Sequence, residues 1–208
     1  MATPKLTTTQ KSGVAVGTVG LILAAIFGVE GFHSNDPNDP GGATTFGCTE
    51  AVARADGYTG PMIQLSKARC ADILRRQFIE KPGYMPIVER EPVLAFEIID
   101  TGVNAGTGRS SPWFQESLNL FSRGGRDYPK ITADGKVGPA TIAAFDNLRR
   151  ARGPKKACEL MVKSADAYQA AHYQKLCKGS YALSSFCVGW FDHRIGNAPI
   201  ENCGSGHL

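Results

Sequence analysis

The chain has 208 residues, which is enough for one compact domain of ordinary size with a short extra segment and too few for two large enzymatic domains. Hydrophobic residues make up 42% and charged residues 20% of the chain. These values exclude a disordered acidic chain, a fibrous repeat and a polytopic membrane protein. The net charge of +4 is modest and scattered. It therefore predicts no nucleic-acid groove, although it favours weak attraction to an anionic polymer such as a bacterial envelope.

An uncharged segment runs from Ser12 to Val29, after Lys5 and Lys11 and directly before Glu30. Its length is near the minimum for a membrane span, and the lysines predict that the chain after Val29 is exported. Glycine, threonine and alanine make it weakly hydrophobic, which permits escape from the bilayer. A cleaved signal peptide, a permanent anchor, a buried core helix and an uncleaved signal that later leaves the membrane all remain open. We favour the releasable signal, because cleavage near AAIFG would cut directly before Glu30.

All the cysteines follow the apolar segment, on the side that is predicted to be exported. They are Cys48, Cys70, Cys158, Cys177, Cys187 and Cys203. This position fits an oxidising compartment and up to three disulfides. The spacing predicts neither a zinc site nor a catalytic thiol partnered by histidine. By neighbourhood we expect Cys48 to pair with Cys70 and the other four to pair within the C-terminal half, although six cysteines allow about fifteen pairings.

Beyond Val29 the hydrophobic periodicity predicts a mostly helical chain. Ser66 is a candidate N-cap for a helix that ends at Pro82 and Gly83. Further helices are predicted over residues 91–103 and 113–121, from Pro139, after Pro154 and over residues 183–194. The helix of residues 91–103 is too densely apolar for a surface helix and should be central. Strand signals are sparse, with a short ribbon at residues 43–47 and a further turn signal around residues 133–137, so the fold class is mainly α (α+β).

The loop from Ser34 to Gly42 is too long and too rich in carboxylates to be a simple turn. Glycosidic bond cleavage needs a proton donor and a second carboxylate that stabilises the oxocarbenium-like centre or activates a water. Glu30 ends an apolar helix, where partial desolvation would favour its protonated form. Asp39 in the polar loop should stay ionised, and Thr45 on the ribbon has a hydroxyl that can hold a water. These three residues are the predicted catalytic group.

The string VEGFHSNDPNDPGGATTFGCTEAVARADGYTG holds this group, with eight residues between Glu30 and Asp39 and five between Asp39 and Thr45. The Glu, Asp, Thr spacing resembles that of phage-type lysozymes. The whole string resembles the glycoside hydrolase family 108 muramidases, whose signature is EGGY followed by NDPxDPGGxTxxGIT. The resemblance continues through AFEIIDTGVNAGTGRSSPWFQ and ADGKVGPATIAAF to GWFDHRI, which is similar to the accompanying type 3 peptidoglycan-binding region. It covers nearly everything from Val29 to about Asn197.

The resemblance implies a lysozyme-like, bilobal helical enzyme with a small β-ribbon by the active site. It implies a phage endolysin that hydrolyses the β-1,4 bond between N-acetylmuramic acid and N-acetylglucosamine. Glu30 matches the family's general acid, and Asp39 and Thr45 match the polar partners. Phe32–His33 and Cys48 replace the family's Gly-Tyr and Ile, which affects the substrate fit and the local disulfide pattern rather than the acid. Endolysins of the signal-arrest-release kind also begin with an uncleaved, weakly hydrophobic helix.

Several further residues are candidates for the site. Asp36 is a rival second carboxylate, since it shares the loop and also suits a turn. Tyr58, in GYTG, is predicted to stack on a sugar ring. Asp100 and Asn104 lie four apart on an apolar helix, where they could line a substrate cleft or form an internal hydrogen-bonded pair. For Asp134, in ADGKVGP, a structural turn is favoured over glycan binding, and the two tryptophans are predicted to be packing residues.

We divide the chain into a releasable segment (1–29), a catalytic lobe (30–98), a helical C-terminal lobe that closes the cleft (99–197) and a tail (198–208). No cofactor or metal is expected. The expected partners are peptidoglycan and, before release, the host inner membrane, with the N-terminus in the cytoplasm and the freed enzyme in the periplasm. We expect a monomer that binds no nucleic acid. The alternatives are a non-catalytic exported peptidoglycan-binding protein and a lytic transglycosylase; the stereochemistry, the host and the release trigger stay open.

Overall fold

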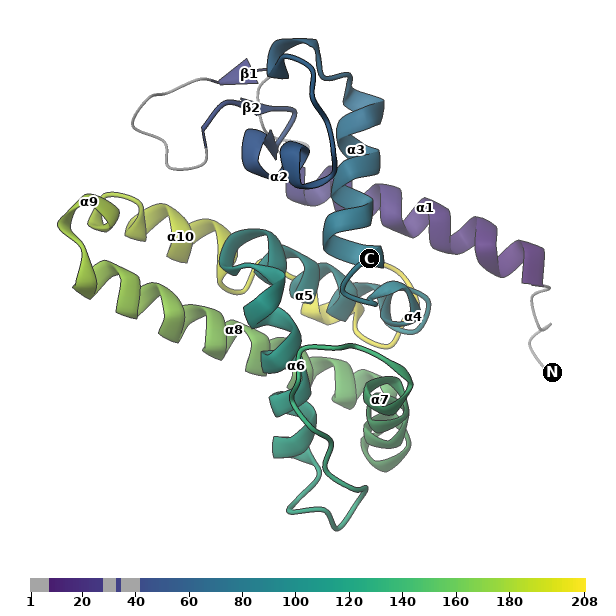
Figure 1. Cartoon of the computed structure of the whole chain (residues 1–208). Coiled ribbons are helices and arrows are strands. Elements are labelled where there is room, and N and C mark those ends of the chain that lie inside the picture. Colours follow the sequence, from purple (N-terminus) through teal and green to yellow (C-terminus); the bar gives the residue numbers. More distant parts are fainter. Residues whose placement is uncertain (1–7, 28–32, 35–41) are drawn as a thin grey trace. The chain divides into compact units, whose positions relative to one another are not determined.

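The computed structural model describes residues 8–27, 33–34 and 42–208 (Figure 1). The chain divides into two compact units, residues 1–81 and residues 82–208, called here the N-terminal and C-terminal units. Helices dominate both units, so the predicted mainly α, lysozyme-like class is confirmed. The predicted boundary between residues 98 and 99 falls inside the continuous helix α5 (Pro92–Ala105), whereas the observed division lies before the turn at Gly83. Gly83 has φ +88°, and a Cβ there would lie 2.3 Å from the Val137 carbonyl oxygen, so this turn requires glycine.

The N-terminal unit contains a small three-stranded sheet and several helices. In chain order its elements are α1 (Thr8–Phe27), β1 (His33–Ser34), β2 (Thr44–Thr45), β3 (Cys48–Thr49), α2 (Glu50–Ala55), the 3-10 turn η1 (Met62–Gln64), α3 (Lys67–Arg75) and the π-helical η2 (Arg76–Glu80). Helix α3 begins where the sequence predicts, because the Ser66 hydroxyl accepts a hydrogen bond from the Arg69 N–H at 3.2 Å. Thr49 caps α2 in the same way, through the Val52 N–H at 3.3 Å. Each cap satisfies a donor that the first helical turn leaves open.

Helix α1 contains most of the apolar segment of the sequence, and one side of it is buried. Val19, Ile22, Leu23 and Ile26 are each at most 8% exposed, whereas Leu21 is 61% exposed. The buried residues follow the i, i+3, i+4, i+7 spacing of one helix face. In the N-terminal unit, α1 packs against α3 (Figure 1). Among the described residues, no helix combines the length and the apolar character that a membrane span needs.

The regular elements of the C-terminal unit, residues 82–208, are all helical. Its elements are α4 (Met85–Val88), α5 (Pro92–Ala105), α6 (Thr107–Phe121), α7 (Pro139–Arg152), α8 (Pro154–Gly179), α9 (Tyr181–Ser184), α10 (Cys187–Arg194) and the 3-10 turn η3 (Ile200–Asn202). Prolines start α5, α7 and α8, where the missing N–H needs no partner. The single last helix that the sequence predicts is instead two helices. The break follows Ser184, whose hydroxyl donates to the Tyr181 carbonyl at 2.6 Å and so competes with the helical hydrogen bonds.

Helix α5 is the centre of the C-terminal unit, as its apolar density predicts. Every residue from Pro92 to Gly102 is buried, and the helix packs against α4, α6 and α8. A helical stretch that is buried on every side has to satisfy its polar side chains inside the protein. Glu97, Asp100 and Thr101 are therefore the side chains of α5 that need internal partners.

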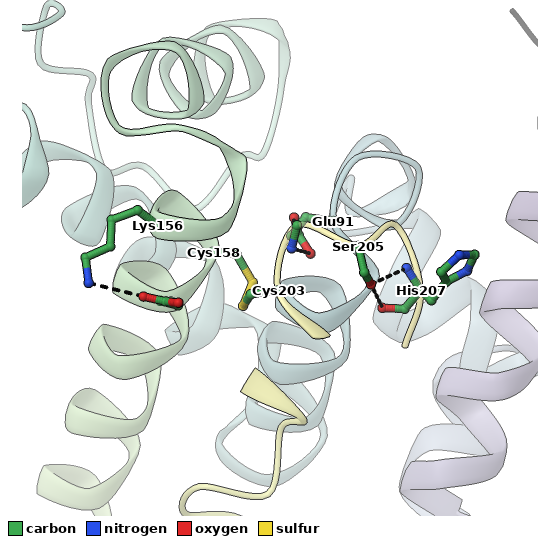
Figure 2. Close-up of a disulfide and its surroundings, with 8 residues drawn as sticks. Glu91, Lys156, Cys158, Cys203, Ser205 and His207 are labelled. Carbon is green, nitrogen blue, oxygen red and sulfur yellow. Dashed lines mark hydrogen bonds and ion pairs between the residues drawn. A yellow bond between two sulfur atoms is a disulfide. The ribbon is translucent and has the colours of Figure 1, made fainter. Parts of the chain in front are cut away.

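Two disulfides stabilise the C-terminal unit, Cys158–Cys203 and Cys177–Cys187, which confirms that these four cysteines pair among themselves. Cys158–Cys203 joins α8 to the segment after η3 (Figure 2). Beside this bond, the Glu91 carboxylate accepts hydrogen bonds from the Gly204 N–H at 3.2 Å. Residues 198–208, which we expected to be a tail, are thus fastened to the unit at two points.

Candidate active site

The sheet of the N-terminal unit holds both ends of the acidic loop. Strands β1 and β2 are antiparallel, with Ser34 opposite Thr44, so the chain leaves and rejoins one ribbon on either side of the loop. Glu30, Asp36 and Asp39 lie outside the described residues. The structure therefore defines where the loop begins and ends, and the roles of the three carboxylates stay predictions.

Thr45 is the predicted site residue that the sheet positions directly. It lies opposite Cys48, and the two residues of the connecting turn, Phe46 and Gly47, have φ values of +51° and +83°. Positive φ at both central residues is typical of a tight type I′ hairpin turn. Thr45 is fully buried, and its hydroxyl donates to the Met62 carbonyl oxygen at 3.0 Å. Because that proton is used inside the protein, the Thr45 oxygen can contribute to a bound water only as an acceptor.

A cluster of ionic hydrogen bonds fixes the helices behind this ribbon. The Asp56 carboxylate, at the end of α2, accepts from Arg76 at 2.6 and 3.0 Å, from Gln77 at 3.1 Å and from Arg69 at 3.3 Å. Hydrogen bonds from Arg76, helped by Gln77 and by the charge of Arg69, lower the pKa of Asp56 to about 2. The cluster joins α2 to α3 and η2, and since α2 follows β3 directly it also orients the ribbon. Sequence reasoning passed over Asp56 because its partners lie 13 to 21 positions away.

Tyr58, the predicted sugar-stacking residue, is half-buried and held in place. Its hydroxyl donates to the Pro61 carbonyl oxygen at 3.0 Å. The Arg54 guanidinium lies 5.7 Å from the ring centroid and donates to the carbonyl oxygens of Tyr58 and Gly60 at 2.8 and 2.7 Å. The guanidinium covers one ring face, so a sugar would have to stack on the opposite face.

Asp100 and Asn104 belong to the C-terminal unit, where they form an internal network. Asp100 is 1% exposed, and it accepts hydrogen bonds from Arg194 at 2.6 Å and from Asn197 at 3.2 Å. The exposed Asn104 donates to the Asp100 carbonyl oxygen at 2.9 Å and to its carboxylate at 3.4 Å. Burial raises the pKa of Asp100 and the charge of Arg194 opposes that rise. Of the two alternatives for this pair, the geometry favours the internal one.

Glu97 is a buried carboxyl that sequence reasoning missed. It is fully buried on α5, and one oxygen accepts from the Thr101 hydroxyl at 3.4 Å. The other oxygen has no hydrogen-bond partner among the described residues. Burial raises the pKa of Glu97 well above its usual range, and the nearby carboxylates of Asp166 and Asp100 raise it further. The signal in the sequence was an acidic residue inside the otherwise apolar run AFEII.

Three potential metal ligands lie together at the Cys158–Cys203 disulfide. They are Glu91, Cys158 and Cys203, all buried, with their ligand atoms within 4.8 Å of one another. The two sulfur atoms share a disulfide, and the carboxylate is occupied by the Gly204 N–H (Figure 2). A disulfide sulfur is not the thiolate that a zinc site uses. With the disulfide formed, these three residues stabilise the C-terminal segment and do not offer a metal site.

Comparison with known protein families matches two parts of the sequence. Residues 23–106 match the family model for Glycosyl hydrolase 108. The chain carries a glycosyl hydrolase 108 domain. It is therefore a glycoside hydrolase that acts on peptidoglycan, and residues 109–195 match a second model, Predicted Peptidoglycan domain.

A solved structure has a fold similar to that of this chain. It is titled "Structure of Brucella abortus SagA", and it has a TM-score of 0.64 and 22% sequence identity to this chain. The similarity covers 88% of this chain and 92% of the other, so it extends over both units, and at this identity it shows the fold alone. No protein among the curated sequences matches significantly.

The glycosyl hydrolase 108 match crosses the division between the two compact units. It covers the N-terminal unit from residue 23 and continues to the end of α5. All six predicted site residues lie in it: Glu30, Asp39, Thr45, Tyr58, Asp100 and Asn104. Arg194, the ionic partner of Asp100, belongs to the peptidoglycan domain. A partly buried ion pair therefore joins the two sequence domains within one compact unit.

Proposed function

We propose that this glycosyl hydrolase 108 enzyme is a phage endolysin that hydrolyses the β-1,4 bond between N-acetylmuramic acid and N-acetylglucosamine. The observation that carries the proposal is the family match over residues 23–106, which includes Glu30, Asp39 and Thr45 at the spacing of phage-type lysozymes. The peptidoglycan domain supports a polymeric cell-wall substrate. The described fold supports the same reading, because its ribbon joins the two ends of the acidic loop.

In this proposal Glu30 is the general acid. Its carboxyl gives a proton to the glycosidic oxygen as the bond to the anomeric carbon breaks. Asp39 stabilises the oxocarbenium-like centre or takes a proton from the attacking water, and Asp36 is its rival in the same loop. Thr45 is the candidate residue for positioning that water, and it can do so only through its hydroxyl oxygen, since its proton is bound by the Met62 carbonyl. The Asp56 cluster holds α2, which directly follows the ribbon that carries Thr45.

The reaction products test this proposal. Purified sacculi digested by the enzyme should release muropeptides that end in a reducing N-acetylmuramic acid, because water adds to the broken bond. Borohydride reduction followed by mass spectrometry identifies that end. Products that lack the mass of one water and resist reduction would identify a lytic transglycosylase. Release of no fragment at all, with binding intact, would identify a binding protein.

We further propose that the N-terminal segment first tethers the enzyme to the host inner membrane and later releases it into the periplasm. The buried stripe of α1 supports this, since Val19, Ile22, Leu23 and Ile26 offer a face that can pack on protein once it has left lipid. Insertion would hold Glu30 at the bilayer surface, away from Asp39. The tethered enzyme should therefore be inactive.

Two measurements check the tethering proposal. The mass of the exported protein should show an intact N-terminus, which excludes a cleaved signal peptide. Membrane vesicles that carry the tethered enzyme should digest sacculi far more slowly than an equal amount of the released protein. Equal rates from the two preparations would contradict control by release.

A further inference from the structure

Two buried thiols lie together at the ribbon of the N-terminal unit. Cys48 on β3 and Cys70 on α3 are 0% and 1% exposed. Their side chains are in hydrogen-bond contact, and the Cys70 thiol also donates to the Phe46 carbonyl oxygen at 3.4 Å. Both are thiols in this structure. The other four cysteines form the two disulfides of the C-terminal unit. Cys48 and Cys70 are therefore the two cysteines that remain to pair with each other.

We propose that Cys48 and Cys70 form a third disulfide, between β3 and α3, when the chain folds in an oxidising compartment. The two existing disulfides already require such a compartment. The proposed bond does not depend on the enzyme's reaction. Only its effect on activity rests on the proposed function.

The reaction is a thiol–disulfide exchange with a small-molecule or protein disulfide as the oxidant. A thiolate of the pair attacks the oxidant and releases one thiol, and the second cysteine then attacks the mixed disulfide and releases another. The cysteines lose two protons and two electrons in total, which convert the oxidant to two thiols. The contact with Cys70, together with burial, raises the pKa of Cys48. Attack is therefore disfavoured in the folded protein, and we expect the bond to form during folding, before β3 and α3 close over the thiols.

The bond would fasten the ribbon to the helix behind it. Cys48 lies opposite Thr45, and Cys70 contacts the carbonyl of Phe46 in the turn that follows Thr45. Since β2 also pairs with β1, a link at β3 restrains both ends of the loop that holds Asp39. In the folded enzyme this link would act together with the Asp56 cluster, because both join the ribbon and the helix that follows it to α3.

Peptide mapping of the full chain tests the bond directly. The protein is refolded with glutathione disulfide and glutathione, denatured without reduction, labelled with N-ethylmaleimide and digested with trypsin. We expect no label on any cysteine, and a linked pair of the tryptic peptides Ser12–Arg54 and Cys70–Arg75. Label on both Cys48 and Cys70, or a link from either to another cysteine, overturns the proposal.

A single substitution provides the matched control. The Cys70→Ala chain should carry one label, on Cys48, and keep the other two disulfides. A second measurement compares thermal unfolding with and without reductant. Reduction should lower the Tm of the wild type by about 6–10 °C more than it lowers the Tm of the Cys70→Ala chain, because that variant has no third bond to lose. An equal loss of Tm in the wild type and in the Cys70→Ala chain would overturn the proposal that a third disulfide stabilises the ribbon. Muramidase activity enters neither readout, so a failure of the proposed function would leave both results unchanged.

Discussion

The Glu30→Gln variant is expected to hydrolyse peptidoglycan about 10²–10⁴-fold more slowly than the wild type while it still binds sacculi. Glutamine keeps the size and most of the polarity of the side chain, but its amide cannot give a proton to the departing sugar oxygen. Binding should persist because the peptidoglycan domain, residues 109–195, does not contain this residue. Turbidity loss of purified sacculi measures hydrolysis, and co-sedimentation with the same sacculi measures binding.

The acidic loop supplies a matched pair of controls. Asp39→Asn should lower hydrolysis strongly, whereas Asp36→Asn, in the same Asn-Asp-Pro context three residues earlier, should have a small effect. All three variants should keep the wild-type circular dichroism spectrum and Tm. Full activity of Glu30→Gln would exclude it as the acid. If Asp36→Asn lowered hydrolysis more than Asp39→Asn, Asp36 would be the second catalytic carboxylate.

Replacing Glu97 by glutamine is expected to make the protein more stable at neutral pH, not less. The folded chain holds the Glu97 carboxyl where burial raises its pKa well above 4.5, the value that applies in the unfolded chain. Below pH 4.5 both states are protonated and the group has no effect on stability. As the pH rises above that value, the unfolded chain loses the proton first, so the free energy of unfolding falls until the pH passes the folded pKa.

The Glu97→Gln chain lacks this titration, so the stability difference between variant and wild type should grow between pH 4.5 and pH 7. We expect a gain of about 1–3 kcal/mol at pH 7, because each unit by which the folded pKa exceeds the unfolded one costs the wild type about 1.4 kcal/mol. Urea unfolding at a series of pH values measures it. Glu89→Gln, which removes an exposed carboxyl instead, is the control for the change in formal charge. A variant that is destabilised equally at every pH would show that Glu97 is held ionised by a partner.

The sequence by itself determined most of the helices and the candidate chemistry of this protein. Ser66, Pro139 and Pro154 mark helix starts because capping and proline geometry act over one turn of chain. The apolar density of residues 91–103 predicted a central helix, since so many large side chains have to leave water together. The spacing of Glu30, Asp39 and Thr45 pointed to glycoside hydrolysis, because the residues that match the family are close together in the chain.

The tertiary structure alone decided which polar groups are satisfied and by what. Asp56 and Asp100 obtain their partners from residues up to 21 and 97 positions away, and Glu97 has an oxygen without a partner among the described residues. The C-terminal segment is fastened by a disulfide across 45 residues, where the sequence indicated a tail. Local patterns report the conformation of a few neighbouring residues. Burial, ion pairs and disulfides depend on which distant segments meet, and that is set by the packing of the whole unit.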